Sequence, residues 1–386
     1  MRYVSAKSIL TDPYRAGLEI GTALVPISPE VILLFASTSY EPDFSDFFEA
    51  LYDTLGTDSV IVFGGTGDGI YETSSAENYG VSALGISSDG RVSWSTAIEQ
   101  GVQADSFAAA GACARKALAS CPASSAFRMV LADGAKADGH AIVGGIAAEI
   151  PGPFFGGLTA DDRKFTSSKV FLNGTEYEDA VAILTGCGDI AFAFNASSGW
   201  TPMGHEGVVE DNQGCEIRTI SGQTAQGFMA GELGKPLGEA DLAIVPLAAY
   251  QAGSSEHFFL RTTSHLHPDS GAITTFGSVE KGTVVRVCSA SREDVMRGVT
   301  DAMQGLTLDF LGFTPSAAIV ISCAGRKWLL ADRGEKEISA LFEHLGYSVP
   351  LIGFPSFGEV SPFRLGDGTY TGVNFHNVTF VVCLLG

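Results

Sequence analysis

The chain has 386 residues, a hydrophobic content of 45% and a formal net charge of −21, from 44 acidic and 23 basic residues. This length exceeds one typical hydrophobic core, so two domains are expected. The apolar content excludes a disordered chain, and the negative charge argues against nucleic acid and anionic membrane surfaces as partners. Since no apolar run is long enough to span a bilayer and the N-terminus lacks a signal-peptide core, we expect a cytoplasmic protein without membrane insertion.

The first third of the chain predicts a strand, a helix, a second strand and a glycine-rich turn. Val31–Ser37 is an apolar run typical of a buried strand, and the helix after it ends at Gly56. A second strand leads into the first glycine turn, V-I-V-F-G-G-T-G-D-G-I, at residues 60–70. Residues 81–87 and 92–98 are then predicted to form a hairpin, because Asp-Gly between them favours a tight turn.

The same pattern begins again twice. A strand at Phe127–Ala132 and a helix lead to the second glycine turn at Pro153–Asp162. A strand at Ala317–Cys323 and a helix lead to the third, P-L-I-G-F-P-S-F-G-E-V-S-P, at Pro350–Pro362, before a last strand at Asn377–Leu384. The recurrence predicts an α+β fold built from a strand-helix-strand-strand unit, with mixed, largely antiparallel sheets packed by helices.

A linker is expected at residues 231–238, G-E-L-G-K-P-L-G, because three glycines and a proline interrupt the pattern. This divides the chain into a lead-in at residues 1–30, a first domain at 31–230 and a second domain at 239–386.

The seven cysteines are scattered, and most lie inside apolar runs. No C-x-x-C pair suggests zinc or redox chemistry, so reduced core thiols are predicted. The residues are Cys113, Cys121, Cys187, Cys215, Cys288, Cys323 and Cys383.

Several motifs, in order, resemble FIST-domain proteins. The matching segments are residues 156–162, Phe165, 169–174, 180–186 and 199–204, followed by 322–326, Glu335, 350–353, 358–360 and 377–379. The resemblance covers the chain from about Glu30 onward and implies a FIST N domain followed by a FIST C domain, without a fused output domain. It also implies an intracellular sensory module, in a family thought to bind small ligands such as amino acids. One departure is Gly69-Ile70, where the family often has glycine followed by glutamate.

Two charged residues are the strongest candidates for a ligand site. Arg326 and Glu359 each follow an apolar strand, so adjacent strands would bring both to one rim of a sheet. There Arg326 could pair with the α-carboxylate of a free amino acid and Glu359 with its ammonium group. The alternative is that the two side chains form a structural ion pair with each other.

The predicted rim includes further residues of the strand ends and turns. Ser322 and Cys323 would line it, although a strand hydroxyl and a core thiol are the plainer interpretation. The amides of the first turn could bind an anion, but its spacing fits neither G-x-G-x-x-G nor a P-loop, so no nucleotide cofactor is predicted. The turn residues assigned to the ligand site are Gly65, Thr66, Gly157 and Thr159.

Metal and catalytic sites are weighed against this binding site. Asp161-Asp162 favours a turn over a cation site, and no third ligand accompanies His265 and His267, so no metal is predicted. An amidohydrolase centred on Cys323, with His376 as base, is the alternative function; no G-x-S-x-G elbow supports it. We therefore expect a ligand-binding sensor with an amino acid-like ligand and, as a further partner, a separately encoded signalling protein.

Overall fold

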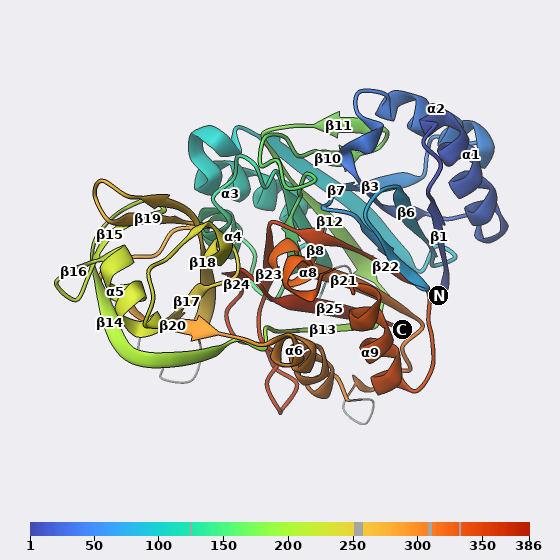
Figure 1. Ribbon diagram of the computed structural model, residues 1–386. Helices are drawn as coiled ribbons and strands as arrows, with labels where there is room; N and C mark the ends of the chain where they lie inside the picture. The colour runs from blue at the N-terminus through green and yellow to red at the C-terminus, as the bar shows by residue number, and fades with distance from the viewer. Residues whose placement is uncertain (124–125, 251–257, 308–310, 332) are drawn as a thin grey trace.

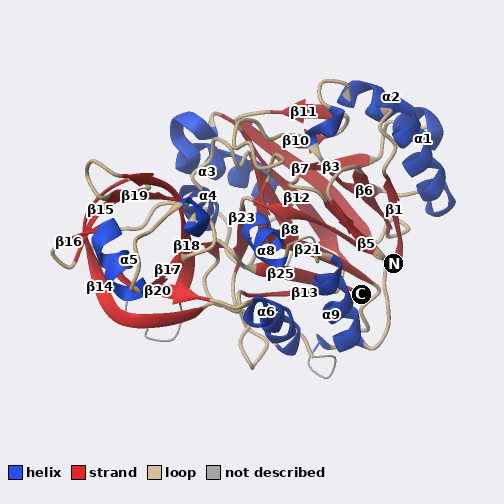
Figure 2. Cartoon of the chain, viewed as in Figure 1, coloured by secondary structure: helices blue, strands red, loops and turns tan. Residues whose placement is uncertain are grey.

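The computed structural model describes residues 1–123, 126–250, 258–307, 311–331 and 333–386. Three six-stranded sheets with helices on their outer faces form a core, and a small β-barrel lies beside it (Figures 1 and 2). The inner faces of all three sheets share one apolar cluster, which includes Phe35, Phe127 and Phe354. No helix of the described chain is long and apolar enough to cross a membrane.

The first sheet carries two helices on its outer face. Its strand order is β1 (Arg2–Ser8), β6 (Val81–Ser87), β2 (Val31–Ala36), β3 (Ile61–Thr66), β10 (Val170–Leu172) and β11 (Thr175–Tyr177). The helices are α1 (Pro13–Leu24) and α2 (Phe44–Leu55). Phe44, Phe47 and Leu51 recur at helical spacing, so α2 buries one apolar face against β2 and β3. The short 3-10 turns η1 (Val25–Ile27) and η2 (Thr38–Tyr40) precede and follow β2.

The second sheet is built mostly from the middle of the chain, with two strands from its C-terminal part. Its order is β24 (Asn374–His376), β23 (Gly358–Ser361), β9 (Phe155–Leu158), β8 (Phe127–Ala132), β12 (Ala180–Gly188) and β7 (Val92–Gln100). Helices α3 (Val102–Ser120) and α4 (Gly139–Ala147) pack on it. The predicted hairpin is wrong: both edges of β6 are taken by β1 and β2, so β7 pairs with β12 in this other sheet.

The third sheet is built mostly from the C-terminal part. Its order is β13 (Phe192–Ser197), β25 (Phe380–Leu385), β21 (Ala317–Cys323), β22 (Leu351–Ser356), β4 (Ile70–Glu72) and β5 (Ser75–Glu77). Helices α6 (Arg292–Gln304) and α9 (Glu335–Leu345) cover it, and α8 (Ala324–Leu330) follows β21 directly.

The barrel is closed because its first and penultimate strands also pair with each other. Its order is β14 (Thr201–Gln213), β20 (Val284–Ser289), β17 (Pro246–Tyr250), β18 (Phe258–His267), β19 (Ala272–Thr275), β15 (Glu216–Ile220) and β16 (Gln223–Thr224), with β14 pairing with β15. Helix α5 (Ala225–Leu233) packs on its apolar interior, and η3 (Glu239–Asp241) follows. The predicted linker at residues 231–238 therefore connects two parts of this barrel.

Each sheet contains the recurring unit that the sequence predicts. The first two strands of a unit are parallel and the third is antiparallel to the first; the units are β2-β3-β6, β8-β9-β12 and β21-β22-β25. The hairpin after each second strand pairs with the second strand of another unit: β4-β5 with β22, β10-β11 with β3, and β23-β24 with β9. This cyclic exchange gives the core a pseudo-threefold arrangement and confirms the predicted α+β fold.

The cysteine prediction is wrong for one pair. Cys121, after α3, and Cys187, in β12, form a disulfide with Cα atoms 6.1 Å apart. They are separated by 66 residues, so only the packing of α3 against the sheet brings them together. The other cysteines of the described chain are free.

Candidate functional site

The three glycine turns meet at the centre of the core through equivalent contacts. Gly64, Gly156 and Gly353 each lie so close to the neighbouring parallel strand that a Cβ atom would come within 1.7 to 2.1 Å of a carbonyl oxygen. Only glycine permits this approach. These glycines therefore set a common origin from which positions in the three turns can be compared.

A ring of backbone hydrogen bonds joins the turns. Counting from each shared glycine, the fifth residue donates its N–H to the carbonyl of the third residue in another turn. The bonds run from Ala160 N to Thr66 O (2.8 Å), from Asp68 N to Pro355 O (3.0 Å) and from Phe357 N to Leu158 O (3.2 Å). The turn amides that could have formed an anion nest are thus used to hold the core together.

The turn residues assigned to the site by sequence lie inside this junction. A Cβ on Gly65 would be 2.4 Å from Thr159 Cγ2, and Thr66 Oγ1 accepts the Lys169 N–H at 2.9 Å. Thr159 Oγ1 donates to Ser168 Oγ, which in turn donates to Asp133 Oδ1 (2.9 and 2.7 Å). A Cβ on Gly157 would lie 2.8 Å from Ile321 Cγ2 and 3.0 Å from the Gly358 carbonyl oxygen, so this glycine is enclosed as well.

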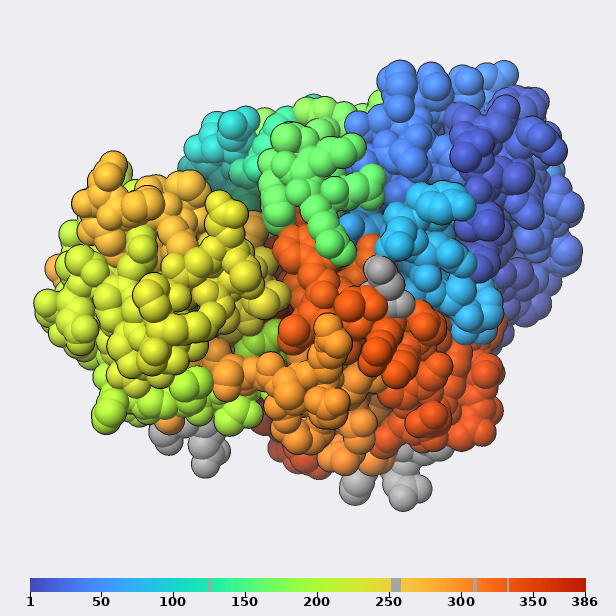
Figure 3. Space-filling model, in the orientation of Figure 1, coloured from blue at the N-terminus to red at the C-terminus, as the bar shows by residue number. Residues whose placement is uncertain are grey.

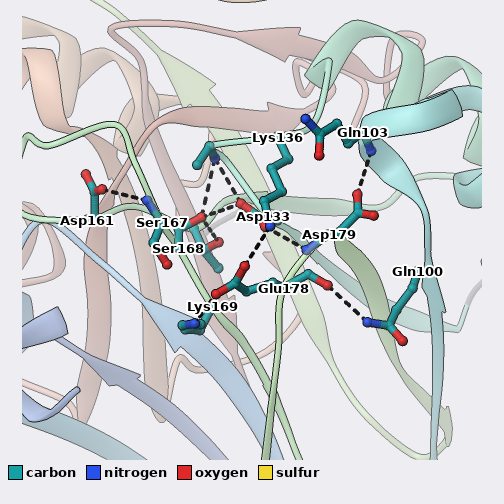
Figure 4. Close-up of polar contacts among 12 residues, drawn as sticks. Gln100, Gln103, Asp133, Lys136, Asp161, Ser167, Ser168, Lys169, Glu178 and Asp179 are labelled. Atoms are coloured by element: carbon teal, nitrogen blue, oxygen red, sulfur yellow. Dashed lines mark hydrogen bonds and ion pairs between the residues drawn. The ribbon is translucent and has the colours of Figure 1, made fainter. Parts of the chain in front are cut away.

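Asp161 organises the loop after the second turn. Its carboxylate accepts the backbone N–H groups of four successive residues, 164–167, at 2.7 to 3.0 Å. Figure 4 shows Asp161 beside Ser167 and, further along, the Asp133 network with Asp179 and Lys136. These contacts agree with a turn at Asp161-Asp162, and no cluster of three or more His, Cys, Asp or Glu side chains suited to a metal ion is found in the described chain.

Glu359 is distinguished by its position in the third hairpin. The equivalent hairpin positions, each next to the strand end of another unit, are Ile70 in the first and Val170 in the second. All three side chains are fully buried. Two units fill this position with an alkyl group and the third with a carboxyl group, so the fold itself has no need of the acid.

The carboxyl group of Glu359 has neutral donors around it. Ser356 Oγ donates to Oε1 at 2.5 Å, and the Thr379 N–H donates to Oε2 at 3.1 Å. Burial raises the pKa of Glu359 to about 8, despite these hydrogen bonds. At neutral pH Glu359 is therefore held mostly in its protonated form, and a nearby cation would favour its ionised form.

Arg326 pairs with Glu337, and the predicted alternative of an Arg326–Glu359 pair is wrong. Arg326 Nε and Nη2 donate to Glu337 Oε1 at 2.9 and 2.8 Å, and both side chains are fully buried. Further N–H groups of Arg326 donate to the carbonyls of Val295 and Ser198. Helix α9 packs over the sheet and places Glu337 next to the Arg326 guanidinium. From the strand order alone, Arg326 was expected to lie next to Glu359.

Ser322 belongs to the same buried network. Its hydroxyl donates to Glu337 Oε2 at 2.9 Å, and Tyr71 OH donates to the same oxygen at 3.3 Å. The signal for Glu337 was present in the sequence, because this acid lies on the apolar face of α9 with Leu341 and Leu345. An acidic side chain on a buried helix face needs a buried cation or hydrogen-bond donors as partners.

Cys323 and His376 lie close to Glu359 but are not arranged as a nucleophile and base. Burial raises the pKa of the Cys323 thiol well above its usual range, whereas burial lowers the pKa of His376 to about 4. His376 Nε2 is 2.9 Å from the Ser361 carbonyl oxygen. The thiol hydrogen-bonds the Glu359 carboxyl group rather than His376, so Cys323 and His376 do not form the pair that the alternative function needs.

A cleft of about 480 Å³ lies between the barrel and the core. This volume falls within the range of small-molecule sites, about 300–1,000 Å³. Its walls combine aromatic and aliphatic groups with charges of both signs. The lining residues include Trp200, Phe258, Leu260, Arg297, Asp301, Phe363, Arg364, His376 and Thr379.

The cleft reaches the environment of Glu359. Thr379 lines the cleft and binds the Glu359 carboxyl group through its N–H, and His376, also in the cleft wall, lies opposite Glu359 in the β23–β24 pairing. Sequence reasoning placed Glu359 and His376 near the site but missed Arg297 and Asp301. Their spacing of four residues on α6, with opposite charges on one helix face, was the available signal.

The loop held by Asp161 closes another side of the junction between the barrel and the core. Phe165 stacks on Phe357 with ring centroids 4.3 Å apart and lies 5.4 Å from Phe276 of the barrel. In Figure 3 the green segment that contains this loop lies against the orange-red segment of α8. Residues of the second turn, third turn and barrel therefore share one aromatic contact.

The protein thus consists of a core of interlocked units, a barrel and a cleft of about 480 Å³ between them. Family models match the chain as a FIST N domain over residues 30–223 and a FIST C domain over residues 216–362. The chain belongs to the FIST family, as its motifs predicted. FIST domains are recognised as sensory domains of signal transduction.

Other comparisons add no functional relative. No curated protein matches the sequence. Among solved structures, T. maritima PurL complexed with FGAR matches at 12% identity and a TM-score of 0.23, covering 100% of this chain and 72% of that chain. The same protein complexed with AMPPCP matches at 12% identity and a TM-score of 0.21. Scores this low carry no argument about fold or function.

Proposed function

We propose that this protein is a cytoplasmic sensor that binds a small zwitterion or carboxylate, of the amino acid class, in the cleft between barrel and core. The observation that carries the proposal is the composition of that cleft, which offers both signs of charge beside aromatic surface in about 480 Å³. Such a combination suits a ligand that has a carboxylate, an ammonium group and an apolar part.

The charges give the ligand an orientation. Arg297 and Arg364 can receive the carboxylate, since guanidinium groups bind carboxylates in a bidentate manner. Asp301 lies one helical turn from Arg297 and can receive the ammonium group. Trp200, Phe258 and Phe363 supply the apolar wall for the ligand's side chain.

Glu359 does not line the cleft but lies directly behind two residues that do. Through Thr379 and His376 it adjoins the cleft, and its raised pKa leaves it mostly protonated without ligand. A bound ammonium group favours the carboxylate, so ligand binding would release part of a proton. The site residues of the proposal are thus Glu359, Arg297, Asp301 and Arg364, while Arg326 and Ser322 support the fold.

Signal output requires a change that a partner can detect. Because the barrel contributes Phe258 and Leu260 to the cleft and the core contributes Arg297 and Asp301, a ligand that contacts both would bias their relative position. A separately encoded signalling protein would read that change.

The test begins with mass spectrometry of small molecules released from the purified protein, followed by isothermal titration with a panel of amino acids. Arg297→Ala and Asp301→Asn are each expected to weaken binding by at least about tenfold, the loss typical of a hydrogen-bonded charge. Arg115→Ala is the matched control, because Arg115 also forms a surface ion pair and is exposed to the same degree, 59% against 58% for Arg297.

Two results would reject the proposal. If no panel member binds and no ligand is released, the protein is not a sensor of this class. If a ligand binds equally well to Arg297→Ala, Asp301→Asn and the control, it occupies another place.

A further inference from the structure

A second cavity, of about 80 Å³, lies between the first hairpin, Lys327 of α8 and the start of α9. Its lining residues are Lys327, Tyr71, Ala76, Glu77, Asn78 and Gly334, and the Glu77 carboxylate pairs with Lys7. None of these residues lines the cleft between barrel and core. This volume is about one sixth of that of the cleft, so the cavity admits a smaller molecule than the cleft does.

The cavity contains a buried cation. Lys327 is 6% exposed, and burial lowers the pKa of its ammonium group. In the described chain its Nζ donates only to Asp68, to the carbonyl oxygen and to Oδ1, the latter at 3.5 Å. An ammonium group has three N–H donors, so one remains for a molecule in the cavity.

The anion that balances Lys327 is shared. Asp68 Oδ2 also accepts Trp328 Nε1 at 2.6 Å and lies 3.6 Å from Arg163 Nε. The remaining nearby acids are committed elsewhere, because Asp162 accepts from Thr38 Oγ1 and Glu77 pairs with Lys7. A small anion at Nζ would therefore complete the neutralisation of Lys327.

Glycines keep the space open. Gly69 has a φ of +100°, and a Cβ there would lie 3.1 Å from Lys327 Nζ. A Cβ on Gly334 would lie 3.0 Å from Ala76 Cβ and 3.3 Å from the Tyr71 ring. Side chains at either position would displace the ammonium group or fill the cavity.

We propose that this cavity is a second binding site, separate from the cleft, that takes a small inorganic or organic anion of the size of formate, bicarbonate or acetate. The carboxylate or carbonate oxygens accept from Lys327 Nζ and from the amide of Asn78, and the Tyr71 ring forms the apolar side. Because this cavity is smaller than the cleft, the two sites select ligands of different size.

The probes are sodium formate and sodium acetate, titrated calorimetrically into the full chain at constant ionic strength against sodium chloride. Wild type is expected to bind one anion saturably. Lys327→Met should abolish this binding, and Asn78→Asp, which keeps the shape but adds negative charge, should weaken it at least tenfold. Ala76→Leu, which fills the cavity and leaves Lys327 in place, should also weaken it at least tenfold. Lys336→Met removes an exposed lysine of α9 and should bind as wild type does.

The outcomes separate this site from the cleft. Binding that survives in Arg297→Ala but not in Asn78→Asp or Ala76→Leu supports the proposal. Absence of saturable binding to wild type overturns it. Binding that is lost in Arg297→Ala and kept in Lys327→Met also overturns it, because the anion then occupies the cleft.

Discussion

The first and third glycine turns have the same backbone and different chemistry. Both begin at a glycine that touches a neighbouring carbonyl, and both contribute to the ring of turn-to-turn hydrogen bonds. At the equivalent hairpin position the first turn has Ile70 and the third has Glu359, and both side chains are completely buried. Since Ile70 satisfies the fold there, the carboxyl group of Glu359 is best explained by function.

The hydrogen-bond donors around Glu359 and around Ile70 also differ. The donors to Glu359 are the Ser356 hydroxyl and the Thr379 N–H. At the matching places the first turn has Gly67, which has no side chain, and Gly80, whose N–H already donates to Ser37 Oγ. Of these two turns, the third is the one equipped to receive a carboxyl group at this position.

The largest effect is expected from the carboxylate that the fold does need. Glu337→Gln removes the charge that neutralises buried Arg326, and breaking such a pair costs about 3–5 kcal/mol. Chemical denaturation should show this loss, whereas Glu359→Gln, which leaves no cation without its ion pair, should lower the unfolding free energy by less than about 1 kcal/mol. Equal losses in both variants would mean that Glu359 is structural.

Placing a glutamate at the equivalent position of the first turn should also lower the stability of the protein. Ile70→Glu buries a carboxyl group without donors and is expected to destabilise the protein by about 3 kcal/mol or more. Ile70→Leu is the control and should cost less than about 1.5 kcal/mol. If thermal unfolding shows Ile70→Glu to be as stable as Ile70→Leu, the two turns are interchangeable and the comparison fails.

A smaller effect is expected on the pH dependence of stability. The folded-state pKa of Glu359, about 8, lies above its unfolded value, so its contribution to stability is complete at low pH and is lost as pH rises through 8. His376, with its pKa lowered to about 4, contributes only changes below about pH 6.5.

Between pH 6.5 and 8 the unfolding free energy of wild type should therefore fall, by at most about 1.4 kcal/mol per pH unit. Glu359→Gln should remove this part of the slope. Parallel curves for the two proteins in urea denaturation would show that Glu359 does not titrate in this range.

The sequence predicted the features that depend on local pattern. Glycines at strand ends, as at Gly64 and Gly353, marked the three turns, and the recurring unit gave the fold class. Features made by chain segments meeting in space were missed. Helix α9 brings Glu337 to Arg326, β7 leaves β6 for another sheet, and Cys121 reaches Cys187 across 66 residues.

The site was predicted in part for the same reason. Glu359 stood out because it follows a glycine turn, whereas Arg297 and Asp301 become relevant only because the barrel lies across α6 and encloses a cleft. The family motifs fall on the turns and strand ends, and the cleft residues of α6 lie outside them.

The most direct test of the central claim converts the third turn into the first. Glu359→Ile should remain folded, with an unfolding free energy no more than about 2 kcal/mol below that of wild type, because apolar burial offsets the lost hydrogen bonds. Its affinity for the ligand identified by mass spectrometry, measured by titration calorimetry on the same preparation, should fall at least tenfold. Unchanged affinity in a stably folded Glu359→Ile protein would contradict the account, because Glu359 would then have no part in ligand binding.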